Sequence, residues 1–189
     1  MKKLCVLLAA LLFLGATFAA AQPVPGKKFE LGTSVGLFSY HYESDLWSDS
    51  WTVLNVPVRF GWFVWKGLQL EPEVVVTIPF GESKGGEVTY FLTTNLAYNF
   101  KTGKKLVPFL GGTAGIGNGI PYMGWVSGGS GEKVTAFGGL AGVKYLIGDV
   151  AAIRAEYRLL FYNWKDDVDP MYDETGNIHQ FLIGLSIFF

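Results

Sequence analysis

Apolar and polar residues alternate with a period of two through most of this chain. In AAIRAEYRLLFY (151–162), Arg154, Glu156 and Arg158 occupy every second position, and the residues between them are apolar. Successive side chains of a β-strand point to opposite faces, whereas an amphipathic helix repeats about every 3.6 residues. The alternation therefore predicts strands, and no helix of useful length is expected after residue 21.

Eight alternating segments are separated by clusters of Gly, Asp, Asn and Ser, which favour turns. The expected strands span 29–43, 52–64, 68–80, 87–100, 106–119, 132–147, 150–164 and 177–189. The second, fourth and sixth connections are short, as in WKG and GD, and the odd-numbered ones tend to be longer. This parity is typical of membrane barrels, which have short periplasmic turns and longer outer loops.

The two faces of the expected strands differ in charge. In segment 68–80, Glu71 and Glu73 share one face with other polar residues, and the opposite face is apolar. A water-soluble barrel of the lipocalin type would turn such charges outward, whereas a membrane barrel turns them into its lumen. An arginine facing lipid at the midplane costs about 2–4 kcal/mol, while charges inside a barrel can pair with one another. A water-soluble two-sheet sandwich, the other alternative, would leave the aromatic apolar face uncovered.

The sequence thus predicts an all-β fold, an eight-stranded antiparallel up-and-down transmembrane β-barrel. Four acids and four bases are expected to form an ion-pair network in its lumen: Glu30, Arg59, Glu71, Glu73, Lys144, Arg154, Glu156 and Arg158. Glycines are expected on the same face: Gly32, Gly36, Gly61, Gly112, Gly138, Gly142 and Gly184. Aromatic residues are expected at one level near the short turns, where any single one could also be core: Trp62, Trp65, Tyr98, Phe100, Phe109, Tyr145 and Phe189. A second level is expected near the long loops: Trp51, Phe80, Tyr90, Phe161 and Trp164.

The first residues predict export. Lys2 and Lys3 precede an apolar run that ends in three alanines at 19–21. The run is shorter than the roughly 20 residues of a spanning helix, so residues 1–21 are predicted to be a secretory signal peptide cleaved before Gln22. Residues 22–189 are then one barrel domain. The only cysteine, Cys5, lies in the signal peptide, so no disulfide or cysteine-based metal site is expected.

Charge and motifs exclude several functions. Lys and Arg number 15 and Asp and Glu 16, and this near balance does not suggest nucleic-acid binding. The sequence lacks a P-loop, a dinucleotide fingerprint, zinc-ligand spacing and a kinase signature. No cofactor, metal site or catalytic residue is therefore predicted.

The segment FLIGLSIFF (181–189) places large apolar residues at every second position: Phe181, Ile183, Leu185, Ile187 and Phe189. VPFLGGTAGIG (107–117) is an expected strand in which a proline and an aromatic residue precede several glycines. With these features, residues 22–189 resemble the small eight-stranded bacterial outer-membrane barrels of the OmpA, OmpX and OmpW kind. Members of that group are described as porin-like, and their barrel is often called an outer membrane protein beta-barrel domain. The resemblance implies a place in the outer membrane of a Gram-negative envelope, with a last strand that the outer-membrane assembly machinery recognises. Outer-membrane lipids and lipopolysaccharide are the other expected partners, and a monomer is expected.

An eight-stranded barrel is just wide enough to be filled by its own side chains, so no wide pore is expected. The predicted function is an integral outer-membrane protein, not an enzyme, that acts through extracellular loops or in envelope integrity. The resemblance leaves a narrow channel for small or apolar solutes as an alternative. A second alternative is a lipid-modifying outer-membrane enzyme, for which His41, Ser39 and Glu43 share a face and His179 is expected across the barrel seam.

Two of the outer loops have open interpretations. IPYMGWVSGGSG (120–131) is either an adhesive or lipid-contacting tip or a loop whose aromatic residues fold back on the rim. KDDVDPMYDETG (165–176) is either a calcium-binding or a solvated acidic loop, and it does not match EF-hand spacing.

Overall fold

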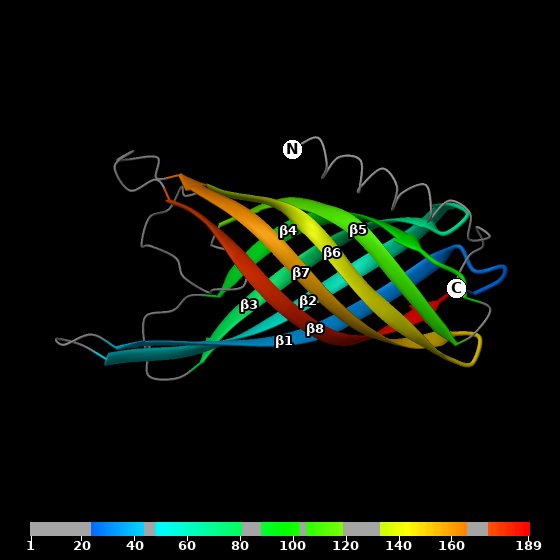
Figure 1. Cartoon of the computed structure of the whole chain (residues 1–189), viewed down its shortest axis with the longest axis horizontal. Helices are drawn as coiled ribbons and strands as arrows, with labels where there is room; N and C mark the ends of the chain where they lie inside the picture. Colours follow the sequence, from blue (N-terminus) through cyan, green and yellow to red (C-terminus); the bar gives the residue numbers. More distant parts are fainter. Residues whose placement is uncertain (1–23, 44–47, 81–87, 103–104, 119–132, 166–173) are drawn as a thin grey trace, which may run out of the picture.

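The computed structural model describes residues 24–43, 48–80, 88–102, 105–118, 133–165 and 174–189, without the side chains at 38–43, 48–51, 80, 133, 164–165 and 174. The described strands are β1 (Phe29–Glu43), β2 (Ser48–Trp65), β3 (Leu68–Phe80), β4 (Thr89–Asn99), β5 (Leu106–Gly117), β6 (Lys133–Ile147), β7 (Ala151–Lys165) and β8 (Glu174–Phe188). They form one closed antiparallel barrel in sequential order, with β8 returning to β1 (Figure 1). The predicted eight-stranded up-and-down barrel is confirmed. No helix among the described residues has the length and hydropathy that a membrane span requires.

Some strand ends differ from the prediction. β2 begins at Ser48 rather than 52, and β8 begins at Glu174 rather than 177. The backbone pairing continues to the ends of the β1–β2 and β7–β8 hairpins, where Glu43 pairs with Ser48 and Trp164 pairs with Glu174. Backbone hydrogen bonding extends these strands through polar residues, which hydrophobic alternation does not detect.

One end of the barrel carries the tight turns, and we call it the turn end. Two residues, Lys66 and Gly67, join β2 to β3, and 148–150 join β6 to β7. Gly67 has φ 92° and Gly148 has φ 65°, a left-handed conformation that glycine adopts at no steric cost. Phe29 and Phe189 exchange backbone hydrogen bonds of 3.0 Å at the same end. The opposite end, where β1 and β2 meet at Glu43 and Ser48, we call the loop end.

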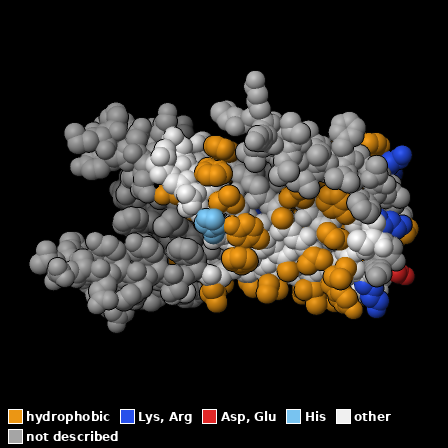
Figure 2. All heavy atoms as spheres, in the orientation of Figure 1, with side chains coloured by type: hydrophobic (Ala, Val, Ile, Leu, Met, Phe, Trp, Pro, Cys, Tyr) orange, Lys and Arg blue, Asp and Glu red, His pale blue; other side chains and the backbone are white. Residues whose placement is uncertain are grey.

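The outer wall of the barrel is apolar. Burial alternates along β4 without a break, with Thr93 and Asn95 inside and Leu92 and Leu96 outside. Phe181, at 74% exposure, is among many large apolar side chains on the outer wall. Figure 2 shows apolar side chains spread along the wall between the two ends. This arrangement is the reverse of a water-soluble barrel, whose outer wall is polar.

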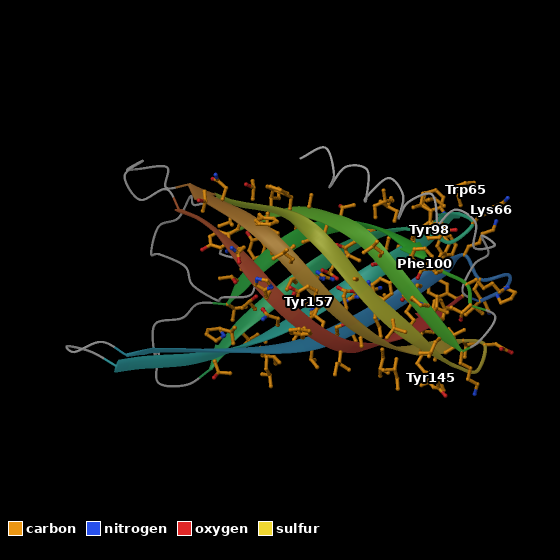
Figure 3. All side chains as sticks on the ribbon, viewed as in Figure 1. Trp65, Lys66, Tyr98, Phe100, Tyr145 and Tyr157 are labelled. Carbon is orange, nitrogen blue, oxygen red and sulfur yellow. The ribbon has the colours of Figure 1, made fainter. Side chains whose placement is uncertain are left out.

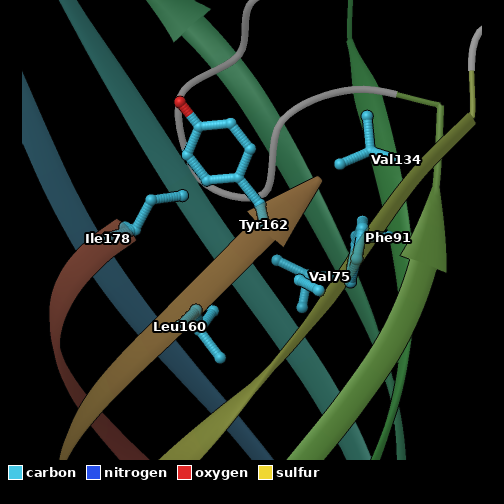
Figure 4. Close-up of a cluster of buried hydrophobic side chains, with 7 residues drawn as sticks. Val75, Phe91, Val134, Leu160, Tyr162 and Ile178 are labelled. Carbon is cyan, nitrogen blue, oxygen red and sulfur yellow. The ribbon is translucent and has the colours of Figure 1, made fainter. Parts of the chain in front are cut away.

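The lumen holds apolar clusters as well as charges. At the turn end Val24, Phe63, Ala152 and Phe188 form one cluster. Toward the loop end a larger cluster forms the lining of the lumen (Figure 4): Val75, Phe91, Val134, Ala136, Leu160, Tyr162 and Ile178. The inward face therefore combines polar and apolar side chains along its length.

One predicted side-chain direction is wrong, and one aromatic residue expected at the level of the short turns lies inside. Phe109 is buried in the lumen with Ala97 and Leu140. Gly112 was expected inside, but it faces outward beside Gly139 of β6. Both lie on β5, where small residues occupy both faces between 111 and 115 and weaken the alternation on which the prediction depended.

The β1–β8 seam is paired over a short distance. β1 pairs with β8 from Glu30 to Val35 and from Phe188 back to Ile183, whereas β6 pairs with β7 along the whole length from 133 to 147. Beyond Val35, β1 continues paired with β2 alone, and β8 continues paired with β7 alone, within the described residues. In Figure 1 the loop ends of β1 and β8 diverge.

Candidate functional site

The eight charged residues expected in the lumen lie on five strands and point inward. Glu30 comes from β1, Arg59 from β2, Lys144 from β6, and the others from β3 and β7. None of the eight is more than 4% exposed. Because β3 and β7 are four strands apart in either direction around the ring, pairs between them cross the lumen.

Arg154 and Glu71 form the first crossing pair. The Nη1 and Nη2 atoms of Arg154 donate to the two carboxylate oxygens of Glu71 at 2.8 and 3.0 Å. The Nε of the same guanidinium donates to Glu156 Oε2 at 2.7 Å. The Phe109 ring faces the same guanidinium, with its centroid 4.3 Å from the Arg154 guanidinium carbon. A two-bond contact of this kind fixes geometry as well as charge.

Arg158 and Glu73 form the second crossing pair. Arg158 Nη1 and Nη2 donate to the Glu73 oxygens at 2.6 and 2.8 Å, and Arg158 Nε donates to Glu156. Arg59 links the two acids, since its Nε lies 3.1 Å from Glu73 Oε2 and its Nη1 donates to Glu156 Oε2 at 3.2 Å. Glu156 is thus shared by three arginines.

Lys144 and Glu30 extend the network toward the turn end. Lys144 Nζ lies 2.6 Å from Glu30 Oε2 and 3.8 Å from Glu71 Oε1. Gln69 connects the same groups, because its Nε2 donates to Glu30 Oε2 at 2.7 Å and its Oε1 accepts from Lys144 at 2.8 Å. Phe109 also faces the ammonium, at 5.4 Å from its ring centroid. All eight charges therefore belong to one connected and electrically balanced set.

Sequence reasoning did not assign several residues that complete this set. Ser34 accepts a 2.8 Å hydrogen bond from Arg59, and Thr93 donates to Glu73 at 3.1 Å. Asn99 donates to Gln69 Oε1 at 3.0 Å. Gln69, Thr93 and Asn99 lie at inward positions of the alternation, so their polarity was the available signal. Phe109 had no such signal, because an aromatic residue fits either face.

The histidine constellation of the enzyme alternative is only partly described. The side chains of His41, Ser39 and Glu43 lie outside the described residues. His179 is exposed on the outer wall, and its Nδ1 lies 2.5 Å from the Tyr157 hydroxyl. β1–β8 pairing ends at Val35, so backbone pairing does not hold His41 beside His179. Within the described residues no group of three or more His, Cys, Asp or Glu side chains is arranged to hold a metal ion.

Other predictions fall partly or wholly outside the described residues. The signal peptide at 1–21 and the loop at 120–131 lie wholly outside them, and the acidic loop at 165–176 lies mostly outside them. The side chains of Trp51, Phe80 and Trp164 are also outside them. The expected recognition strand is described: Phe181, Ile183, Leu185, Ile187 and Phe189 are all exposed on the outer wall.

No family model matches the chain, and no curated protein sequence matches it. Among solved structures, the chain is similar to Neisserial surface protein A (NspA), at 15% identity and a TM-score of 0.58, over 85% of this chain and 96% of that one. It is also similar to the outer membrane protein OprG from Pseudomonas aeruginosa, at 14% identity and a TM-score of 0.44, over 90% and 99% of the two chains. The likeness to NspA confirms, at the level of the fold, the resemblance to small eight-stranded outer-membrane barrels.

Proposed function

We propose that this protein is an integral barrel of the bacterial outer membrane, inserted after removal of residues 1–21, whose lumen is closed to solutes. It acts at its loop end or as a structural component of the envelope, as a monomer and not as an enzyme. The apolar outer wall and the fold shared with NspA support a place in a membrane. The proposed partners are outer-membrane lipids, lipopolysaccharide and the assembly machinery, which recognises β8.

The observation that carries the closed lumen is the pair of arginine–glutamate contacts that cross it. Arg154 with Glu71 and Arg158 with Glu73 join opposite walls at mid-height, and all four side chains are buried. The lumen of an eight-stranded barrel has room for side chains or for one small ligand. With these groups in place, little cross-section remains for a hydrated ion.

Conductance in planar bilayers tests the proposal. The wild-type protein is expected to insert without stepwise ohmic conductance, because the network occupies the lumen. Arg154→Ala removes a guanidinium from the crossing pair and is expected to produce small conductance steps. Lys101→Ala, at an exposed position of the turn end, is the matched control and should stay silent. Regular open channels in the wild type would refute a closed lumen.

One observation favours a second candidate, the binding of small apolar solutes at the loop end. The apolar lumen cluster lies toward that end, where the seam between β1 and β8 is unpaired beyond Val35 and Ile183. An apolar molecule could therefore reach the cluster without crossing the ionic network. This candidate involves binding above the network and requires no passage through it.

A fluorescent fatty acid tests this candidate with the protein folded in detergent. Val134→Glu puts a charge into the apolar cluster and is expected to abolish saturable binding. Thr135→Glu puts the same charge on the outer wall one residue away and should retain it. If the wild type shows no saturable binding, the second candidate is excluded.

A further inference from the structure

Basic side chains gather at the turn end. Lys28, Lys66, Lys101 and Lys105, which we call the lysine ring, are exposed there. Among the described residues at this end, Asp149 is the only exposed acidic side chain. Figure 2 shows the blue side chains along this end with a single red one. The opposite end differs in sequence, since DDVDPMYDE (166–174) is strongly acidic.

The lysine ring lies beside an aromatic belt. Trp65 and Tyr145 are exposed on the outer wall, and Figure 3 shows them at the same end as Lys66, Tyr98 and Phe100. The Lys66 ammonium lies 5.9 Å from the Trp65 ring centroid. Tryptophan and tyrosine favour the boundary between hydrocarbon and headgroups, and lysine extends its charge beyond that boundary into the polar layer. In a bilayer the ring therefore lies at the height of the lipid phosphates.

The four lysines lie along the β1–β5 side of the rim rather than in one compact patch, whereas the β6–β7 turn carries Asp149. Lys28 precedes β1, Lys66 is in the β2–β3 turn, and Lys101 and Lys105 follow β4 and precede β5. Such spacing suits several separate headgroups around the wall better than one compact ligand over the lumen.

We propose that the lysine ring binds the headgroups of anionic phospholipids in the leaflet at the turn end, so that the barrel selects these lipids from a mixed membrane. The inference rests on the proposed membrane function. Each ammonium near an anionic surface is attracted to it, and the attraction weakens with salt. The connection at 166–174 is acidic in sequence, so the selection is assigned to the turn end alone.

Spin-labelled lipids test the proposal with the full mature chain in vesicles of phosphatidylcholine and phosphatidylglycerol. The relative association constant of labelled phosphatidylglycerol over phosphatidylcholine is measured for three proteins. In the wild type it is expected to exceed one and to fall in high salt. Lys66→Gln/Lys105→Gln is expected to lower it toward one, because each lysine near an anionic surface is attracted to it. Lys133→Gln/Lys165→Gln removes the same charge from the loop end, where the two residues pair across β6 and β7, and should leave it unchanged.

The outcomes separate this inference from the function on which it rests. A wild type that inserts but shows no preference for phosphatidylglycerol would overturn the inference alone, as would equal losses in the two double variants. A wild type that fails to insert would contradict the proposed function, and this inference with it.

Discussion

At the scale of single residues, the network makes each charge depend on several partners. Arg154→Met would leave Glu71 buried without its closest cation and would remove one of the three arginines that contact Glu156. Removing one partner of a buried pair costs about 3–5 kcal/mol, because the remaining charge keeps its desolvation penalty. We expect the free energy of unfolding to fall by about that amount, measured by urea titration of the protein in vesicles.

Two further variants calibrate this result. Lys101→Met removes a cation that is exposed at the turn end, and it should change stability by no more than about 0.5 kcal/mol. The double variant Arg154→Met/Glu71→Gln should lose less than the sum of its single losses, because the two residues are in contact. If Arg154→Met were as mild as Lys101→Met, the arginine would not be buried in a network.

The sequence indicates which charges share a face but not which atoms meet. Arg154 and Glu71 are 83 residues apart, and their contact depends on the closure of the barrel. Alternation is a local property, so it separates inward from outward positions without giving height or partner. The same limit explains Phe109, whose ring lies inside the lumen against Gly142 of β6, where an added Cβ would lie 2.5 Å from Phe109 Cζ.

At the scale of elements, the β1–β8 seam is where the strands separate. Thr33 and Leu185 are paired neighbours, whereas Ser39 and His179 would face each other only if pairing continued in the same register. The chain after residue 21 has no cysteine, so two cysteines can be introduced without a native thiol that would compete for the disulfide. With an oxidant, Thr33→Cys/Leu185→Cys is expected to form a disulfide readily, because paired strand neighbours lie within bonding range.

Ser39→Cys/His179→Cys is the comparison for that pair. It is expected to cross-link slowly or not at all, as followed by gel mobility before and after reduction. Equal cross-linking at both positions would mean that β1 and β8 are paired as far as the loop end. The unpaired seam that supports apolar binding at that end would then be absent. The existence and order of the strands followed from local patterns, but the length of this seam did not, because it joins the first strand to the last.

At the scale of the whole molecule, the barrel is polar inside at mid-height and apolar outside, and its folding should depend on lipid contact. Val74 and Leu106 are similarly exposed on the outer wall, at 43% and 47%. Val74 lies in the middle of β3, whereas Leu106 begins β5 at the turn end. An arginine on the lipid face costs about 2–4 kcal/mol at the bilayer midplane and about 0–1 kcal/mol near the interface.

Val74→Arg is therefore expected to reduce the free energy of folding into vesicles by several times as much as Leu106→Arg. The difference depends on depth alone, because both variants add the same charge to equally exposed sites. In a barrel surrounded by water, both arginines would be solvated and both effects would be close to zero. Both effects are measured by reversible urea unfolding in vesicles. Equal and small effects would contradict an outer wall that faces lipid. The proposals for the closed lumen and for the lysine ring would then lose the membrane location on which both depend.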